Sequence, residues 1–387
     1  MAATRTLLIV LAGGAGAGLE TLTEARAVPA LRFAGSHRLI DFPLSNARNS
    51  GLSEVWVLEQ HHPGSLAEHL GGGRPWDLDR TRGGLRVRAP QPGGRRTGSA
   101  DALWRVADAI EAALPEVVLV AAADAVYRMD YAEVVGHHLG SGAELTLVTT
   151  RHDGDRSRLG VVTARDGVVT DYAYRPTEPA GDLVTTGVLA FDPRALLAGL
   201  EQARHDRGTR GLGDVGEHLL PTMVRRGVVG EYRHAGSWQP IATVEGYWRA
   251  HMDLLAKPPF GLDDPAWPIS TCDLRQAAVR VQPGAELESV VLAPGVVVQG
   301  TVRRSVLGPG VHVAPGAVVE DAVLLDDVRV GPAARVSRAV VDEGARVRGR
   351  AEVGGEAADD EVALVGADAV VHPRKRVPAG GRYPAGA

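Results

Sequence analysis

The feature that most constrains the fold is a repeat of aliphatic residues in the last third of the chain. They stand six apart in five pairs: Val281 and Leu287, Val296 and Val302, Val313 and Val319, Val330 and Val336, and Val347 and Val353. Successive pairs begin 15, 17, 17 and 17 residues apart, and Pro-Gly dipeptides recur between them. A hexad register of about three hexads per coil predicts a parallel β-helix, in which each coil stacks its aliphatic row on the next. A disordered linker rich in Val, Gly and Pro, the alternative, would not keep this register.

The chain before this repeat follows a different pattern. Short β-branched runs at residues 53–58, 116–120 and 144–148 alternate with helical stretches such as residues 100–113. Such alternation predicts an α/β domain with a mostly parallel sheet, whose ligand site lies at the carboxyl ends of the strands. We therefore expect the following organisation: an α/β domain over residues 1–256, a Pro-rich linker over 257–274, the β-helix over 275–372 and a flexible tail over 373–387.

A glycine-rich segment follows the first predicted strand. The apolar residues 7–10 lead into a turn that contains Gly13, Gly14, Gly16 and Gly18. Such a turn lets backbone N–H groups approach a phosphate that a Cβ would keep away. Phosphoryl chemistry also calls for a cation to hold the developing charge. The next basic residue is Arg26, so the sequence predicts a phosphate-binding loop without a cation of its own.

Charge and cysteine content limit the classes of partner and compartment. The formal net charge is −5, so no basic excess exists to displace the counterions of a nucleic acid. The single Cys272 rules out an intrachain disulfide and fits a reducing compartment. The first apolar run is too short to span a membrane. We expect a cytoplasmic protein without nucleic acid or membrane partners.

Several local motifs occur together in an order typical of one family. They include residues 39–46 (LIDFPLSN), 49–51 (NSG), 98–102 (GSADA), 127–131 (YRMDY) and 265–269 (PAWPI). With these motifs, the glycine loop and the hexad repeat, the chain resembles ADP-glucose pyrophosphorylase (glucose-1-phosphate adenylyltransferase), a family of sugar-phosphate nucleotidyltransferases. The similarity covers roughly residues 7–350. The resemblance implies a Rossmann-like nucleotidyltransferase domain followed by a left-handed parallel β-helix of hexapeptide repeats.

The resemblance also implies a reaction and a set of binding residues. Members of the family convert ATP and glucose 1-phosphate into ADP-glucose and pyrophosphate, with Mg²⁺ held by two carboxylates. The implied positions here are Gly13, Gly14, Gly16, Gln60, Gly98, Ala100 and Asp101 for the nucleotide, Gly160, Arg175 and Gly187 for the sugar phosphate, and Arg26, Arg32 and Arg38 for an anionic effector. Solvated surface arginines are the alternative for the last group. An ordinary exposed glutamine is the alternative for Gln60.

Charged residues of the family's motifs are missing at five positions. Gly18 stands where the family's loop has an arginine, Val28 where a lysine follows, and Pro240 where the second metal carboxylate would lie. The acid of the sugar-phosphate motif is replaced by Tyr174, and a lysine by Glu217. Removing one preorganised electrostatic contact typically costs about 10²- to 10³-fold in rate. Jointly, these losses predict a dismantled reaction centre.

One metal carboxylate of the family is retained. It is Asp124, which we interpret as a residual catalytic residue and metal ligand, the alternative being a polar loop residue. Mg²⁺ is expected only if activity remains.

These departures lead to one main hypothesis and its alternatives. We predict a catalytically impaired homologue that acts as a regulatory or structural subunit in glycogen or α-glucan synthesis. It would form a homo-oligomer, or a hetero-oligomer (a tetramer) with an active pyrophosphorylase. The alternatives are an active nucleotidyltransferase that uses Arg26, Arg32 and Arg175 with Asp124 on the metal, and a module that senses nucleotide sugars or sugar phosphates. A general-base role for His312, as in hexapeptide acyltransferases, is a further alternative, whereas the resemblance implies a structural β-helix.

Overall fold

The first strand of the chain lies in the middle of a large sheet. A computed structural model describes residues 4–90, 98–227, 229–256, 261–273, 275–356 and 361–384. Leu7 and Ile9 of β1 (Thr6–Ala12) pack on one face of the sheet, and Leu8 and Val10 pack on the other. Because helices cover both faces, residues 7–12 of β1 are all apolar and do not alternate with polar residues.

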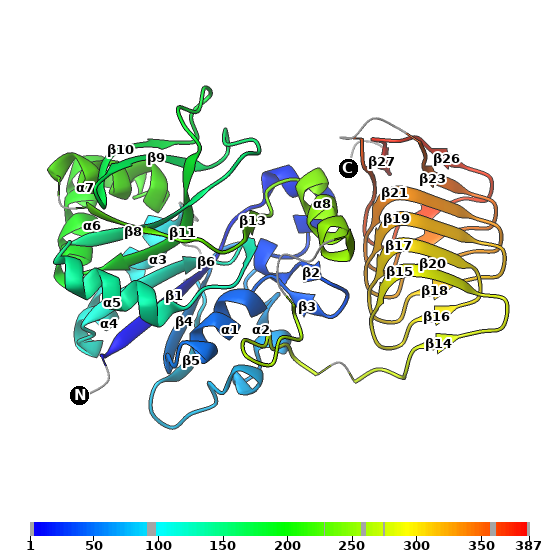
Figure 1. Ribbon diagram of the computed structural model, residues 1–387, viewed down its shortest axis with the longest axis horizontal. Coiled ribbons are helices and arrows are strands. Elements are labelled where there is room, and N and C mark those ends of the chain that lie inside the picture. Colours follow the sequence, from blue (N-terminus) through cyan, green and yellow to red (C-terminus); the bar gives the residue numbers. More distant parts are fainter. Residues whose placement is uncertain are drawn as a thin grey trace.

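The sheet has the strand order β5-β4-β1-β6-β11-β8-β12-β10-β9 (Figure 1). Seven of these nine strands run in one direction within the described residues, and only β10 and β11 run in the other. The predicted mostly parallel sheet is therefore confirmed, but β11 runs antiparallel to both of its neighbours, β6 and β8. The other strands are β4 (Glu54–Glu59), β5 (Gly84–Arg88), β6 (Val117–Ala122), β8 (Leu145–Arg151), β9 (Gly160–Arg165), β10 (Val168–Tyr174), β11 (Leu183–Phe191) and β12 (Val229–Arg233).

Helices cover the sheet from both sides. One face packs against α1 (Asp41–Asn49), α2 (Ala67–Leu70) and α5 (Tyr131–Ser141). The other packs against α3 (Ser99–Arg105), α4 (Ala107–Ala113), α6 (Pro193–Arg207) and α7 (Leu220–Arg226). The single helix predicted over residues 100–113 is thus two helices, because Val106 leaves the helical region with φ −109° and ψ 7°. Nowhere in the described ranges does a helix reach the length and apolarity needed to cross a membrane.

Shorter elements connect this framework. Two small ribbons are formed by β2 (Arg32–Phe33) with β3 (His37–Arg38), and by β7 (Ala125–Tyr127) with β13 (Trp238–Pro240). The 3-10 helices are η1 (Ala17–Thr23), η2 (Val28–Ala30), η3 (Arg74–Trp76) and η4 (Gly208–Arg210), and η5 (Val215–Leu219) is a π-helix.

The second part of the chain is a β-helix of parallel strands, as predicted (Figure 1). One row consists of β14 (Arg280–Val281), β16 (Val297–Val298), β18 (His312–Val313), β20 (Arg329–Val330), β22 (Arg346–Val347) and β25 (Val370–Val371). The other consists of β15 (Glu286–Leu292), β17 (Thr301–Leu307), β19 (Val318–Leu324), β21 (Arg335–Val341), β23 (Glu352–Gly354), β24 (Ala363–Val365), β26 (Arg376–Val377) and β27 (Arg382–Tyr383).

The aliphatic rows stack with one correction to the predicted register. Val298, not Val296, lies between Val281 and Val313 in its row. The turn after Val298 is two residues shorter than the turn after Val313, because β17 begins at Thr301 whereas β19 begins at Val318. Gly300 allows this tight turn, since a Cβ there would come within 2.5 Å of the carbonyl oxygen of Ala317.

The β-helix also extends further than predicted. β26 pairs with β23, and β27 pairs with β24, so the coils continue to Tyr383. Most of the segment predicted as a flexible tail from residue 373 therefore belongs to the β-helix, and residues 385–387 lie outside the described residues. The cause is one more pair of valines six apart, Val371 and Val377, which extends the same aliphatic rows.

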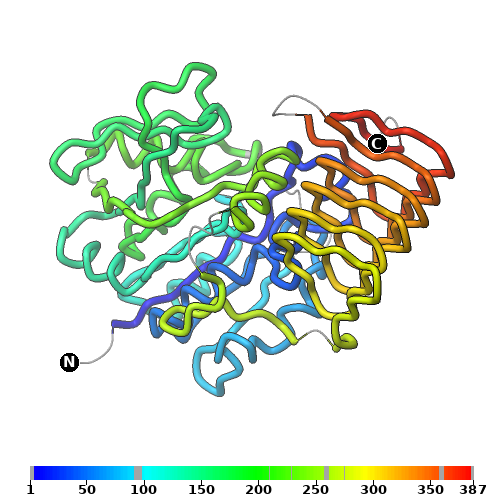
Figure 2. Tube along the Cα trace, turned by 45° about the vertical axis from the view of Figure 1, so that its right-hand side comes forward, coloured from blue at the N-terminus to red at the C-terminus, as the bar shows by residue number. Residues whose placement is uncertain are grey.

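Among the elements of the α/β domain that contact the β-helix are two helices. They are η1, directly after β1, and α8 (Val244–Ala256), which lies between the two domains in Figures 1 and 2. Leu19 and Leu22 of η1 share one apolar cluster with Val362 and Leu364 of the last coils. The indole Nε1 of Trp248 in α8 donates to the carbonyl oxygen of Asp321 at 2.6 Å. The β-helix thus packs directly against the segment that follows the glycine loop.

Candidate active site

The predicted nucleotide residues Gly13, Gln60 and Gly98 lie together at the carboxyl ends of β1 and β4. The Gln60 side-chain amide donates to the carbonyl oxygen of Gly98 at 2.5 Å. A Cβ on Gly13 would come within 2.7 Å of the Gln60 side chain, so only glycine fits there. Gln60 is only 5% exposed, which excludes the ordinary exposed glutamine that was the alternative.

Ala100 and Asp101 have structural contacts in the first turn of α3. The amide of Ala100 donates to the carbonyl oxygen of Gly213 at 2.9 Å. The Asp101 carboxylate accepts from the amides of Leu212 and Gly213 at 3.0 and 3.1 Å. Both residues therefore hold the loop before η5 against α3, and nucleotide contact by them stays a prediction.

At Gly16 the glycine loop packs against the aliphatic side chain of Val28. Gly16 has φ 62°, and a Cβ on it would come within 2.6 Å of the Val28 side chain. Val28 is 3% exposed and joins the apolar cluster of Leu19 and Leu22. The position that the resemblance assigns to a lysine is therefore a buried core position in this chain. Gly14 has no atom within 4 Å of the place of its Cβ, so the top of the loop is open.

Gly18 touches two segments that are distant in the sequence. A Cβ on Gly18 would lie 2.3 Å from the carbonyl oxygen of Ala242 and 2.7 Å from a guanidinium nitrogen of Arg158. Ala242 belongs to the turn between β13 and α8, and Arg158 precedes β9. Arg158 thus brings a cation to the loop that has none in its own sequence. No spacing rule links residue 158 to residue 18, so sequence analysis missed it.

The two positions that the resemblance assigns to metal carboxylates, 124 and 240, lie side by side. β7 and β13 pair antiparallel, with Pro240 opposite Ala125, and the amide of Ile241 donates to the carbonyl oxygen of Asp124 at 2.8 Å. The Asp124 side chain is open to solvent, but the surrounding protein partly desolvates it, which raises its pKa, and the charge of Arg175 opposes this shift.

This donor set does not match the two-carboxylate magnesium site that the resemblance implies. Pro240 has no side-chain oxygen, so Asp124 stands without the second carboxylate. No group of three or more His, Cys, Asp or Glu residues within the described ranges could hold a metal ion.

Tyrosines fill much of the predicted sugar-phosphate region. A Cβ on Gly160 would come within 2.6 Å of the Tyr172 hydroxyl oxygen. Tyr174, in place of the family's acid, donates its hydroxyl hydrogen to Asp214 at 3.1 Å. The Arg175 guanidinium lies 4.8 Å from the centre of the Tyr174 ring. Burial raises the pKa of both tyrosines, so they are neutral hydrogen-bonding groups.

Gly187, the third predicted residue of this region, lies in β11 beside the end of β6. Its φ is 78°, and a Cβ on it would come within 2.9 Å of the Ala122 side chain. The glycine is therefore required by backbone conformation and by close packing.

The predicted effector arginines lie at the boundary with the β-helix. Arg26 pairs with Asp342 at 2.5 Å and Glu343 at 2.8 Å, and Arg32 pairs with Asp326 at 2.8 Å. Arg26 and Arg32 are 9% and 8% exposed, so the alternative of solvated surface arginines is wrong for both.

Arg38, half-buried beside them, donates to the carbonyl oxygen of Ala30 at 3.3 Å, and burial together with the charge of Arg32 lowers its pKa. An effector role for the three arginines stays a prediction. An anionic ligand would have to displace the carboxylates that already neutralise Arg26 and Arg32.

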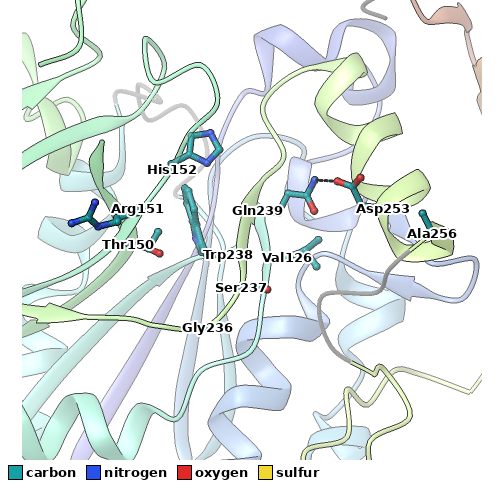
Figure 3. Close-up of a pocket in the computed structure, with 10 residues that line it drawn as sticks. All are labelled: Val126, Thr150, Arg151, His152, Gly236, Ser237, Trp238, Gln239, Asp253 and Ala256. Atoms are coloured by element: carbon teal, nitrogen blue, oxygen red, sulfur yellow. Dashed lines mark hydrogen bonds between the residues drawn. The ribbon is translucent and has the colours of Figure 1, made fainter. Parts of the chain in front are cut away.

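A pocket of about 470 Å³ lies at the end of β8, between β13 and α8 (Figure 3). Its wall includes His152 and Trp238, whose rings meet edge-to-face with centres 6.0 Å apart. Gln239 donates to the Asp253 carboxylate at 3.2 Å along another side. None of the predicted site residues lines this pocket. Of its lining, Trp238 and Gln239 directly precede Pro240 in β13.

Comparisons with known proteins agree with this architecture. The family described as "Nucleotidyl transferase" matches residues 7–257, and the family described as "GlmU-like, C-terminal hexapeptide" matches residues 276–371. The boundary between these matches lies in the predicted linker.

The chain is also similar to glucose-1-phosphate adenylyltransferases from several bacteria. It is 33% identical to that of Acetivibrio thermocellus over 83% of this chain and 77% of the relative. The identity to that of Thermotoga maritima is 35% over 81% of this chain and 76% of the relative. For Halalkalibacterium halodurans it is 35% over 80% of this chain and 83% of the relative. The nucleotidyl transferase architecture and these relatives together show that the chain belongs to the glucose-1-phosphate adenylyltransferase family.

Proposed function

We propose that this protein is a catalytically impaired member of its family. It keeps the nucleotide loop and serves as a regulatory or structural subunit beside an active glucose-1-phosphate adenylyltransferase. The observation that carries the proposal is Pro240. It occupies the second carboxylate position, on the strand directly opposite the residue that follows Asp124. A hydrocarbon ring there cannot hold a metal ion or neutralise charge.

The packing around the glycine loop supports the same proposal. Val28 is a core residue under Gly16, and Gly18 is in contact with the Ala242 backbone. Val28 is thus held in the core, and Gly18 has no side chain, so neither residue can bring a charged group into the site. Close packing at these positions thus stands where the resemblance implies charged side chains, which supports an impaired reaction centre.

The nucleotide side of the site supports retained binding. Gly13, Gln60 and Gly98 lie together at the ends of β1 and β4, Gly14 has free space at the place of its Cβ, and backbone N–H groups can bind phosphate without a side-chain cation. We therefore propose ATP or ADP-glucose as the ligand of this loop, and glucose 1-phosphate near Arg175. The protein would act in the cytoplasm in the synthesis of an α-glucan such as glycogen.

A second candidate is an active nucleotidyltransferase, and Arg158 favours it. Its guanidinium lies beside Gly18, and Arg175 lies near Asp124, so two cations approach the region that would hold phosphates. Arg26 and Arg32 are less suited to this role than the sequence predicted, because β-helix carboxylates already pair with them.

A steady-state assay of the purified chain with ATP, glucose 1-phosphate and Mg²⁺ separates the two candidates. We expect no turnover above background, and a rate of about 1 s⁻¹ or more, common for enzymes, would overturn the proposal. If such activity appears, Asp124→Asn should abolish it and Arg158→Ala should reduce it strongly.

Binding experiments separate a subunit from a sensing module. We expect calorimetric heat with ATP or ADP-glucose, and co-purification with an active family member expressed in the same cells. Binding without any association would favour a nucleotide-sugar sensor. Association without binding would leave a purely structural subunit and overturn the nucleotide-binding part of the proposal.

A further inference from the structure

Arg382 contacts the segment that follows the glycine loop, although it lies almost at the other end of the chain. Its guanidinium donates to both carboxylate oxygens of Glu20, at 2.5 and 2.8 Å. The same guanidinium donates to Glu245 at 3.1 Å. Glu20 lies in η1 and Glu245 in the first turn of α8. One side chain of the last strand therefore holds two elements of the α/β domain.

The guanidinium is itself fixed by the β-helix. Its remaining N–H group donates to the carbonyl oxygens of Val362 and Gly380, at 2.7 and 3.0 Å. Arg382 belongs to β27, which pairs with β24. Because the planar fork of arginine is fully engaged, its position is set by the coil and not by solvent.

The two elements that Arg382 holds are the ones that meet at Gly18. Gly18 is two residues before Glu20, and Ala242, whose carbonyl oxygen faces Gly18, is three residues before Glu245. The distance that would separate a Gly18 Cβ from that oxygen is 2.3 Å, so the contact is as close as a glycine permits. An attraction that draws Glu20 and Glu245 to a common cation keeps these segments together.

Glu20 needs such support, because its backbone is strained. Its φ is 51° and its ψ is −130°, outside the regions that residues with a Cβ normally adopt. Backbone strain of this kind persists only where surrounding contacts over-determine the conformation. The ion pair with Arg382 and the burial of Leu19 and Leu22 on either side of Glu20 supply those contacts.

We propose that Arg382 is a positioning residue for the glycine loop: the last coil of the β-helix sets the shape of the loop that would bind nucleotide, through the ion pairs to Glu20 and Glu245. The proposal rests on the proposed function only for its consequence, weaker nucleotide binding when the pairs are lost. The mechanical part, that Arg382 holds the loop, stands on the contacts alone.

Hydrogen–deuterium exchange of the full-length protein tests the mechanical part. In Arg382→Ala, we expect the amides of Leu19 and Glu24, which close the two turns of η1, to exchange at least about tenfold faster, since a charge-assisted bidentate pair is lost. The exchange rate in Arg382→Lys should lie between those of the wild type and Arg382→Ala, because lysine keeps the charge but not the planar fork of donors. Glu20→Ala should loosen the same amides from the loop side, which covers the case that Arg382→Ala folds poorly.

Arg376→Ala is the matched control. Arg376 lies one strand earlier on the same coils, is 75% exposed, and pairs only weakly with Glu352 at 3.9 Å. Its removal should leave the exchange of η1 unchanged. If Arg382→Ala and Glu20→Ala also leave that exchange unchanged, the proposal is overturned.

Calorimetry with ATP then separates this inference from the proposed function. If the wild-type protein binds ATP, we expect Arg382→Ala to bind about tenfold more weakly or worse and Arg376→Ala to bind as the wild type does. Unchanged affinity in Arg382→Ala would overturn the link to binding. If the wild type binds no ATP while exchange rises in Arg382→Ala, the nucleotide-binding function fails and the role of Arg382 in holding the loop remains.

Discussion

The backbone carbonyl of Asp124 accepts a hydrogen bond from the amide of Ile241 at 2.8 Å, which places Pro240 beside the carboxylate predicted as a residual metal ligand. Position 240 therefore lies next to Asp124 through the backbone pairing, which makes it the place to introduce a second carboxylate as a test.

Pro240→Asp should restore part of the metal site. We expect ADP-glucose formation that depends on Mg²⁺ to rise at least about tenfold over the wild type, because a second carboxylate is worth up to about 10²- to 10³-fold but Gly18 and Val28 remain. Pro240→Asn is the control, since it removes the proline without adding charge. Equal rates in the two variants would show that the missing carboxylate does not limit the chemistry.

Gly18→Ala should destabilise the protein although alanine is a small residue. Its Cβ would collide with the Ala242 carbonyl oxygen, and overpacking of this kind costs about 1–3 kcal/mol. Gly14→Ala, in the same loop with nothing within 4 Å, should change stability by about 0.5 kcal/mol or less. Thermal unfolding compares the two variants.

Gly18→Arg should fail to restore activity, because the arginine side chain would meet the same close contact. A gain of turnover in that variant would contradict the interpretation that close packing at Gly18 leaves no room for a side chain.

Arg26→Ala should weaken the contact between the domains. It would leave the Asp342 carboxylate, which is fully buried, without its cation, and breaking a buried pair typically costs about 3–5 kcal/mol. Burial already raises the pKa of Asp342 to about 6, and removing Arg26 should raise it further. Urea unfolding measures the loss. Arg303→Ala, which removes an exposed pair in the β-helix, should cost no more than about 1 kcal/mol. Similar losses in both variants would contradict a special role for the buried pair.

His251 should make the protein less stable in acid. Its ring is buried, Nδ1 donates to the carbonyl oxygen of Tyr247 at 2.9 Å, and Nε2 accepts from the amide of Ala34 at 3.3 Å. Burial lowers its pKa to about 4 from an ordinary 6.5. The unfolded chain therefore binds the proton first, and this contribution to stability is full above pH 6.5 and is lost as the pH falls towards 4.

The size of the effect follows from the shift and is on the order of 3 kcal/mol between pH 7 and pH 4. The free energy of unfolding of the wild type, measured across this range, should fall by that much more than that of His251→Gln, which cannot titrate. His205→Gln, an exposed histidine of α6, should follow the wild type. Parallel curves for all three proteins would contradict the prediction.

Patterns that depend on near neighbours in the chain can be read from the sequence alone. The row of Leu287, Val302, Val319, Val336 and Val353 stacks in the β-helix as the hexad spacing predicts. The first strand and its glycine turn also lie where the apolar run predicts them. The register failed only at Val298, where a turn two residues shorter than its neighbours keeps the row in line but breaks the spacing.

Periodicity carries this information because stacking and sheet formation are repeated local geometries. The substitutions at Gly18, Val28 and Pro240 are likewise visible in the sequence, since the resemblance defines what each position should hold. What the sequence by itself determined was therefore the two-part architecture and the family, whereas the loss of charge at the reaction centre stays a prediction.

Only the tertiary structure decided what surrounds those positions. Arg158 reaches Gly18, Arg26 pairs with Asp342, and Arg382 binds Glu20, and in each case the partners are more than 100 residues apart. No periodic pattern links such residues, because their contact depends on how whole elements pack and not on the spacing along the chain. The composition of the glycine loop is thus visible in the sequence, whereas its contacts with the β13–α8 turn and, through Glu20, with the β-helix are visible only in the tertiary structure.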